Sequence, residues 1–191
     1  MLLASLGVLA QYSAPPGFIY NTAMTLPELP LEEAIGKALT RLGLTVSVAE
    51  SCTGGLIGHR LTNVPGSSGY FAGGVIAYSY DAKERVLEVG HNTLYDFGAV
   101  SEQTAREMAR GVRRKLGTDI GVSVTGIAGP GGGLPGKPVG LTWVGLSARD
   151  ADQARDFVWD GDREANKASS AEAALRLLMD YLDGLKTAGA S

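Results

Sequence analysis

Strand-like and helix-like patterns alternate along most of this chain, and this alternation constrains its fold more than any other feature. Runs of β-branched and apolar residues predict strands, while apolar residues recurring every three or four positions predict helices. The expected strands cover 44–49, 73–79, 119–124, 139–147 and 154–160, and the expected helices lie at about 31–42, 56–62, 81–89, 102–116 and 168–182. Helices interleaved with strands, followed by a hairpin, predict an α/β fold: a three-layer α/β/α sandwich on a mixed sheet of about five strands.

Polar residues and glycines mark the expected ends of these helices. Gly43 and Gly117 are placed to end the first and the fourth helix, and Ser101 is placed to cap the start of the fourth. Asp81 followed by Glu84 is a variant of the capping box, which predicts that the third helix begins at Asp81.

The length and the uninterrupted pattern predict one domain over residues 24–191. The chain has 191 residues, and compact domains commonly have about 50 to 250. Its first 23 residues include the apolar run MLLASLGVLA, which is shorter than the roughly 20 residues that a bilayer-spanning helix needs. A signal peptide has Lys or Arg before its apolar run, and neither residue precedes this one. Residues 1–23 are therefore expected to be a flexible extension or a mis-called start. The protein is expected to be cytoplasmic, with no membrane partner.

The charge balance and the scarcity of metal-binding side chains argue against several classes of function. Lys and Arg number 17 against 20 Asp and Glu, a formal net charge of −3, which argues against neutralisation of nucleic-acid phosphates. One cysteine cannot form an internal disulfide, and one cysteine with two histidines cannot complete a His/Cys zinc cluster. No nucleic-acid partner, metal or redox cofactor is expected, although this count leaves a carboxylate-bound Mg²⁺ open.

Glycine is concentrated in one loop. Of the 191 residues, 27 are glycine, about twice the ordinary share of this residue. Six of these glycines lie in TGIAGPGGGLPGKP at 125–138. The loop matches GxGxxG and the first part of a P-loop, but both motifs need a following helix to hold the phosphate. Here Pro135 and Pro138 precede a β-rich run, so neither motif is expected to function. The loop is either a flexible connection or a backbone-lined site for an anion or oxyanion, opening at Thr125 where a strand ends.

A strand–turn–helix junction at 50–55 offers two competing nucleophiles. Cys52 is the stronger nucleophile by intrinsic chemistry, and a helix N-terminus lowers the pKa of a thiol. Cysteine nucleophiles commonly have a histidine partner, however, and neither His59 nor His91 has an evident claim to that role. Ser51 is the other candidate. In a purely structural interpretation, Ser51 caps the helix and Cys52 is a small buried apolar residue.

Lys83 and Tyr78 bracket the next strand–helix junction. Lys83 is expected in the first helical turn, where the helix dipole and burial both disfavour its charged form and lower its pKa. A neutral lysine is a competent general base for a serine hydroxyl. In the structural alternative, Lys83 is solvated and Tyr78 packs on the sheet.

Four segments in the same order resemble the CinA C-terminal-domain family. They are AESCTGG (49–55), GGVIAYSYDAK (73–83), GAVSEQTAREMA (98–109) and TGIAGPGGGLPGKPVGLTWVG (125–145). The likeness extends over about 28–185. It implies a CinA-like fold and, from the stand-alone members, deamidation of nicotinamide mononucleotide (NMN) to nicotinate mononucleotide and ammonia in pyridine-nucleotide salvage. It also implies a homo-oligomer and a reaction without a metal or cofactor.

The resemblance implies roles for individual residues. Ser51 is the implied nucleophile, with Lys83 and Tyr78 as base and proton relay, and which of the two is the immediate base stays open. The implied substrate-binding residues, including backbone donors for an oxyanion, are Thr53, Gly54, Gly55, Thr125, Gly126, Gly129, Gly131 and Arg163. Among these, Arg163 is implied to contact the substrate phosphate.

Two positions depart from the family pattern. Tyr80 stands where the family usually has Asn, and Lys167 stands where it has a second arginine. Lysine keeps the positive charge but loses the planar fork that binds phosphate through two hydrogen bonds. Two other functions therefore stay open. One is a catalytically silent nucleotide-binding module with the same fold, and the other is a structural or interaction protein. Larger CinA proteins also carry an N-terminal nucleotide-pyrophosphatase domain.

Overall fold

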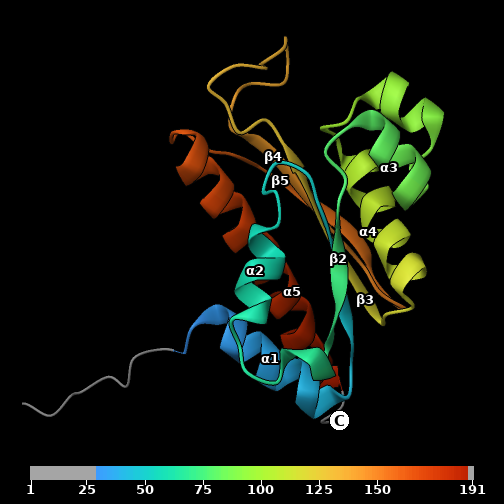
Figure 1. Ribbon diagram of the computed structural model, residues 1–191, viewed down its shortest axis with the longest axis vertical. Helices are drawn as coiled ribbons and strands as arrows, with labels where there is room; N and C mark the ends of the chain where they lie inside the picture. The colour runs from blue at the N-terminus through green and yellow to red at the C-terminus, as the bar shows by residue number, and fades with distance from the viewer. Residues whose placement is uncertain (1–28, 189–191) are drawn as a thin grey trace, which may run out of the picture.

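A mixed five-stranded sheet forms the centre of the computed structural model, which describes residues 29–188 (Figure 1). The predicted extension at 1–23 lies outside the described residues. In sheet order the strands are β2 (Phe71–Ile76), β1 (Val46–Glu50), β3 (Ile120–Gly126), β4 (Leu141–Ser147) and β5 (Asp152–Val158). β1 runs parallel to both β2 and β3, while β4 is antiparallel to β3 and to β5.

Helices cover both faces of the sheet. One face carries α1 (Leu31–Leu42), α2 (Leu56–Thr62) and α5 (Arg163–Ala188), and the other carries α3 (Tyr80–Leu87) and α4 (Glu102–Leu116) (Figure 1). Two short turns complete the described chain, a 3₁₀ turn at Ser67–Gly69 and a π-helical turn at Thr93–Phe97. The predicted three-layer sandwich on a mixed sheet is therefore confirmed.

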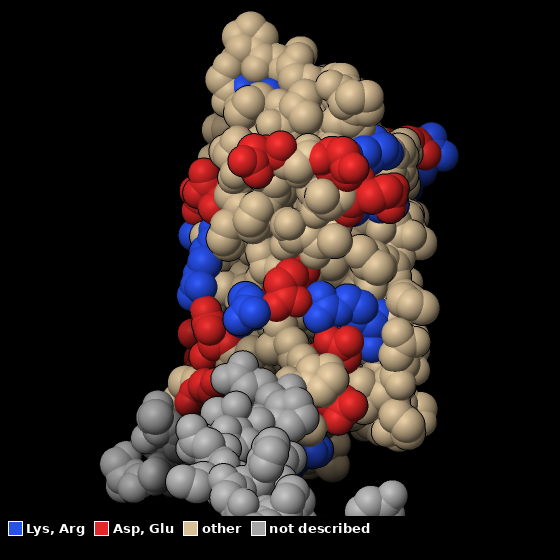
Figure 2. All heavy atoms as spheres, turned by 90° about the vertical axis from the view of Figure 1, so that its left-hand side faces the viewer, with Lys and Arg blue, Asp and Glu red and all other residues tan. Residues whose placement is uncertain are grey.

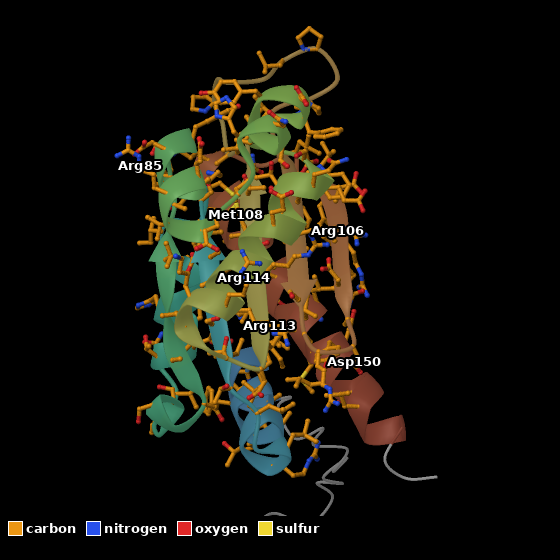
Figure 3. The ribbon with its side chains drawn as sticks, turned by 90° about the vertical axis from the view of Figure 1, so that its right-hand side faces the viewer. Arg85, Arg106, Met108, Arg113, Arg114 and Asp150 are labelled. Carbon is orange, nitrogen blue, oxygen red and sulfur yellow. The ribbon has the colours of Figure 1, made fainter. Side chains whose placement is uncertain are left out.

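Each face of the sheet has its own apolar core. The larger core lies under α1, α2 and α5 and includes Leu39, Ile57 and Leu178, all at most 1% exposed. The smaller one lies under α3 and α4 and includes Met108, and Figure 3 shows these two helices side by side in front of the sheet. Burial of these side chains is the main force that fixes the helices to the sheet.

The helix ends predicted at Gly43, Ser101 and Gly117 are confirmed, and the helix start predicted at Asp81 is wrong. Gly43 and Gly117 end α1 and α4 in the left-handed conformation, and the Ser101 hydroxyl accepts a hydrogen bond from the Thr104 N–H at the start of α4. The prediction that Asp81 caps α3 is wrong, because the Ser79 hydroxyl accepts the Ala82 N–H at 3.1 Å, and Asp81 lies inside the first turn.

The correction at α3 follows from the pairing of the preceding strand. β2 was expected at 73–79, but it pairs with β1 from Phe71 to Ile76 and ends where β1 ends. The chain therefore leaves the sheet at Ala77 and has room for a cap at Ser79. Similarly, α5 begins at Arg163, earlier than its apolar stripe at 168–182 predicted.

The topology brings the ends of three strands together. β1 lies between β2 and β3, and all three are parallel, so their carboxyl ends meet at one edge of the sheet. The connection that follows β1 runs through α2 on one face of the sheet, and the connection that follows β2 runs through α3 and α4 on the other. Ligands of open α/β sheets bind at the strand ends where successive connections diverge in this way. Ser51, Tyr78 and Thr125 follow or end these strands, so the fold gathers them at that edge.

The contact between α3 and α4 gives a test of this packing. A Cβ atom at Gly111 would stand 2.0 Å from the Leu87 carbonyl oxygen. We expect Gly111→Ala to cost roughly 2 kcal/mol or more and to lower the Tm by about 4–8 °C. The matched control is Gly184→Ala in α5. Among the described residues, no atom beyond the adjoining helix backbone lies within 4 Å of the added Cβ, so the Tm should stay level or rise. Equal Tm values for the two variants, measured by calorimetry, would contradict this packing.

Candidate active site

Ser51 and Lys83 form a buried hydrogen-bonded pair. Ser51 follows β1 directly, and its N–H donates to the Val124 carbonyl at 3.0 Å, so the serine is held against the end of β3. The Lys83 ammonium nitrogen Nζ donates to Ser51 Oγ at 2.9 Å and to the Ala77 carbonyl at 2.7 Å. Lys83 is 1% exposed and is among the largest fully buried side chains of the described chain. Lys83 is therefore not solvated, and the alternative interpretation that it is a surface lysine is wrong.

The start of α3 places this lysine. Lys83 is the fourth residue of the helix, and its N–H donates to the carbonyl of the capping Ser79. α3 begins four residues after the end of β2, at the carboxyl edge of the sheet. The Lys83 side chain therefore extends back toward the end of β2. The Ala77 carbonyl at that end fixes Nζ beside the serine.

Burial changes the acid–base properties of two side chains in this site. It lowers the pKa of Lys83 from 10.5 to about 8, so a substantial share of the amine is neutral near physiological pH. Burial raises the pKa of the Cys52 thiol to about 11, which keeps the thiol protonated and weakly nucleophilic. Cys52 is 6% exposed and packs against Gly126, where a Cβ would stand 3.1 Å from its Sγ. Cys52 thus fits the interpretation of a small buried residue.

Glu50 holds the bend that carries Ser51, the candidate nucleophile, and the sequence analysis missed this role. Its carboxylate is 1% exposed and accepts four hydrogen bonds. The donors are the Thr53 hydroxyl at 2.6 Å and the N–H groups of Gly55, Ile57 and Gly58 at 2.9, 3.2 and 2.9 Å. A carboxylate is stabilised by the unpaired N–H groups at a helix N-terminus. The available signal was an acidic residue at the end of an otherwise apolar strand.

The hydrogen-bond donors of Thr53, Gly54 and Gly55, which were predicted to bind substrate, already have acceptors within the protein. The Thr53 hydroxyl and the Gly55 N–H point to Glu50, and the Gly54 N–H donates to the Ser51 carbonyl at 3.2 Å. None of the three residues lines the pocket described next. Ser51 does not cap α2, since Glu50 supplies the acceptors there.

A pocket of about 220 Å³ surrounds the serine–lysine pair. Most of the predicted site residues line it. The lining residues are Ser51, Cys52, Tyr78, Lys83, Ala99, Val100, Thr125, Gly126, Ala128 and Arg163. Besides Thr53, Gly54 and Gly55, two further predicted residues lie outside it. The Gly129 carbonyl accepts a hydrogen bond from the pocket residue Arg163, and Gly131 lies in an open part of the glycine-rich loop.

Arg163 and Tyr78 form a second pair in the pocket. Arg163 opens α5, and its guanidinium donates to the Gly129 carbonyl at 2.6 Å and to the Tyr78 hydroxyl at 3.1 Å. The tyrosine is 62% exposed, so its ring is not packed on the sheet. In this geometry the Tyr78 hydroxyl contacts Arg163, whereas Lys83 contacts Ser51 directly. Lys167, which replaces the second family arginine, pairs with Glu164 at 3.1 Å and does not line the pocket.

Among residues 29–188, no carboxylate pairs with the Arg163 guanidinium, whereas two other arginines of this protein have carboxylate partners. Figure 2 shows acidic and basic side chains interspersed over the face that carries α5. There Arg155 pairs with Asp180 and Arg176 pairs with Glu172, both at 2.7 Å. The acceptors of Arg163 are a carbonyl and a phenol, both uncharged. Arg163 is therefore suited to an anionic group of a ligand.

The glycine-rich loop projects from the edge of the sheet that holds the pocket (the gold loop at the top of Figure 1). Its base is closed by bonds from the Ile127 N–H to the Leu141 carbonyl and from the Gly140 N–H to the Ile127 carbonyl, at 2.8 and 2.7 Å. It returns into β4 and not into a helix, so the two phosphate motifs were correctly set aside. The Lys137 amine donates to the Phe97 carbonyl, which ties the loop to the segment before α4.

The described part of the chain contains neither a cluster of metal-binding side chains nor a helix that could span a membrane. Within residues 29–188, no three His, Cys, Asp or Glu side chains lie close enough together to hold a metal ion. No helix in that range is both long enough and apolar enough to cross a bilayer.

The fold and the pocket define an α/β protein with a serine–lysine pair at the switch point of a mixed sheet. The family model of the CinA C-terminal domain matches residues 28–182, and the chain belongs to this family. A CinA-like protein of Chlorobaculum tepidum is 52% identical over 167 residues, covering 85% of this chain and 38% of that protein. Another, of Salinibacter ruber, is 51% identical over 148 residues, covering 78% and 36%. The chain thus spans about two fifths of the length of these relatives.

Solved structures of the same superfamily share the fold. A competence-damaged protein (CinA) superfamily protein from Klebsiella pneumoniae has a TM-score of 0.78 at 33% identity, covering 81% of this chain and 96% of that one. The competence/damage inducible protein CihA from Agrobacterium tumefaciens has a TM-score of 0.75 at 43% identity, covering 80% and 93%.

The pKa of Lys83 predicts how the reactivity of Ser51 depends on pH. The neutral amine is the form that accepts a proton, and its share rises with pH until the pKa of about 8 is passed. We expect the rate at which a fluorophosphonate labels Ser51 to rise roughly tenfold per pH unit below that value and to level off above it. A rate that stays flat between pH 6 and 10, followed by mass spectrometry of the labelled peptide, would contradict this role for Lys83.

The four hydrogen bonds of Glu50 predict that Glu50→Gln lowers the stability of the protein. In Glu50→Gln, one carboxylate oxygen becomes an NH₂ group that faces N–H or O–H donors, so at least one buried hydrogen bond is lost. We expect a loss of roughly 1.5–3 kcal/mol in the free energy of unfolding and slower labelling of Ser51. The control is Glu102→Gln, which weakens a surface ion pair with Arg106 worth about 0.5 kcal/mol. Urea unfolding measures both variants, and equal stabilities would refute the anchoring role.

Proposed function

We propose that this chain is an amidohydrolase that deamidates nicotinamide mononucleotide to nicotinate mononucleotide and ammonia. The observation that carries the proposal is the 2.9 Å contact between Lys83 Nζ and Ser51 Oγ inside a pocket that also contains Arg163. Membership of the CinA family supports it. The alternative, a nucleotide-binding module without turnover, would use the same pocket without needing the serine–lysine pair.

The first half of the reaction forms an ester. Ser51 Oγ attacks the carboxamide carbon while neutral Lys83 takes the hydroxyl proton, and a tetrahedral intermediate results. The protonated lysine then gives this proton to the nitrogen, the C–N bond breaks, and ammonia leaves. The direct contact between Lys83 and Ser51 favours the lysine over Tyr78 as the immediate base.

The second half restores the enzyme. Water attacks the ester carbon while Lys83 again takes a proton, and the proton returns to Ser51 as nicotinate mononucleotide leaves. The balance is one amide and one water converted into one carboxylic acid and one ammonia, which exchange a proton in solution. These steps use only groups of the chain and water, with no metal or redox cofactor.

The substrate suits the pocket in two respects. Its carboxamide is attached to a cationic pyridinium ring, which withdraws electrons and makes the carbonyl carbon easier to attack. Its phosphate is an anion, and the Arg163 guanidinium in the pocket can donate two parallel hydrogen bonds to it. Tyr78, bonded to Arg163, would then orient the guanidinium. A homo-oligomer, with no nucleic-acid or membrane partner, remains part of the proposal.

Ammonia release from NMN, measured with EDTA present, tests the proposal. The variants are Ser51→Ala, Lys83→Ala and Cys52→Ala. We expect the first two to lose at least about 1000-fold in kcat, because each removes a group that acts in the chemical step. Cys52→Ala should keep activity within about threefold, since a protonated thiol takes no part.

Two outcomes would refute the proposal. If Cys52→Ala alone is inactive, the nucleophile is wrong. If folded wild type releases no ammonia but NMN still raises its Tm, the chain is a nucleotide-binding module.

A further inference from the structure

One wall of the pocket is a short segment between the π-helical turn and α4. Ala99 and Val100 in this segment line the pocket together with Ser51 and Lys83. The segment lies outside any helix or strand, so no regular backbone ladder fixes its position. Its position relative to the serine is set by packing of Ala99 against the smaller apolar core and by hydrogen bonds from side chains of other elements.

The peptide groups of Ala99 are held from two sides. The Thr125 hydroxyl, at the end of β3, donates to the Ala99 carbonyl at 2.7 Å, and Thr125 is 1% exposed. On the other side, the Ala99 N–H donates to the Tyr80 hydroxyl at 3.2 Å. β3 borders the nucleophile turn, and α3 carries Lys83. The wall is therefore fastened to the two elements that adjoin the reacting groups.

Neighbouring carbonyls of the wall are held by different elements. The Gly98 carbonyl accepts from the hydroxyls of Ser101 and Thr104 at 2.9 and 2.8 Å, both in the cap of α4. The Phe97 carbonyl accepts from Lys137 in the glycine-rich loop. Among these contacts, the bond to Tyr80 is the one that joins the wall to the helix of the lysine.

The ring of Tyr80 is itself held in place. It lies edge-on to Tyr95, with ring centroids 5.8 Å apart, and Tyr95 in turn lies 4.3 Å from the ring of His91. Edge-to-face packing of this kind restricts the ring and fixes the direction of its hydroxyl. Tyr80 is 42% exposed and does not line the pocket, so it does not contact the reacting atoms.

We propose that Tyr80 is a positioning residue that sets the fit of the substrate by holding the Ala99–Val100 wall at a fixed distance from the helix of Lys83. The proposal rests on the proposed function for the identity of the substrate. It gives a structural role to a position where the family pattern has asparagine. The catalytic pair does not depend on this bond, because the contacts of Lys83 go to Ser51 and Ala77.

The test compares Tyr80→Phe with Tyr95→Phe in the full chain. Both changes remove one phenol hydroxyl and keep the ring, but the Tyr95 hydroxyl has no hydrogen-bond partner among residues 29–188. For Tyr80→Phe we expect the KM for NMN to rise about fivefold, the effect of one hydrogen bond, with kcat within about twofold of wild type. Tyr95→Phe should leave both constants unchanged. An unchanged KM in Tyr80→Phe, or equal effects in both variants, would overturn the proposal.

A second measurement keeps the test independent of the substrate. A methyl and an aryl fluorophosphonate label Ser51, and the ratio of their rates reports how well the pocket discriminates size. We expect Tyr80→Phe to change this ratio severalfold and Tyr95→Phe to leave it unchanged. If wild type releases no ammonia from NMN, the proposed function fails, while this ratio still decides the role of Tyr80. An unchanged ratio in Tyr80→Phe overturns the role whatever the substrate is.

Discussion

Burial of the Lys83 amine is the constraint on which the candidate site depends. A charged amine removed from water is destabilised unless a group of opposite charge compensates it. Here its hydrogen-bond acceptors are two uncharged oxygens, Ser51 Oγ and the Ala77 carbonyl. The pKa therefore falls to about 8, and the lysine can exchange a proton near neutral pH. The sheet edge supplies both oxygens because β1 and β2 end side by side.

The nearby buried carboxylate of Glu50 binds the backbone of the following bend and has no hydrogen bond to Lys83. Glu50 ends β1 immediately before the serine, and a carboxylate in contact with Lys83 would raise the pKa of that lysine. Its oxygens instead accept four donors of the following bend and of the first turn of α2. The negative charge is thus stabilised by the start of a helix, and the amine keeps its low pKa. The same four bonds fix the backbone that presents Ser51 to the pocket.

Much of the fold and part of the site could be predicted from local pattern. The periods of apolar residues identified the strands and helices, and Gly43, Ser101 and Gly117 marked helix ends because their effects are confined to neighbouring peptide groups. The cap at Ser79 was missed, since it depends on where β2 stops, and β2 stops where its partner β1 ends. A strand boundary set by pairing leaves little trace in the sequence of either strand.

Residue type and apolar period are local properties, so they were enough to predict the layer architecture and the residues able to carry chemistry. Which of these residues meet depends on the packing of the whole domain. This packing placed Lys83 on Ser51, directed Tyr78 to Arg163, and committed the donors of the bend to Glu50. The physical reason is that hydrogen bonding and desolvation depend on distances between segments far apart in the chain. Those distances are set only when three parallel strands end at one edge of the sheet.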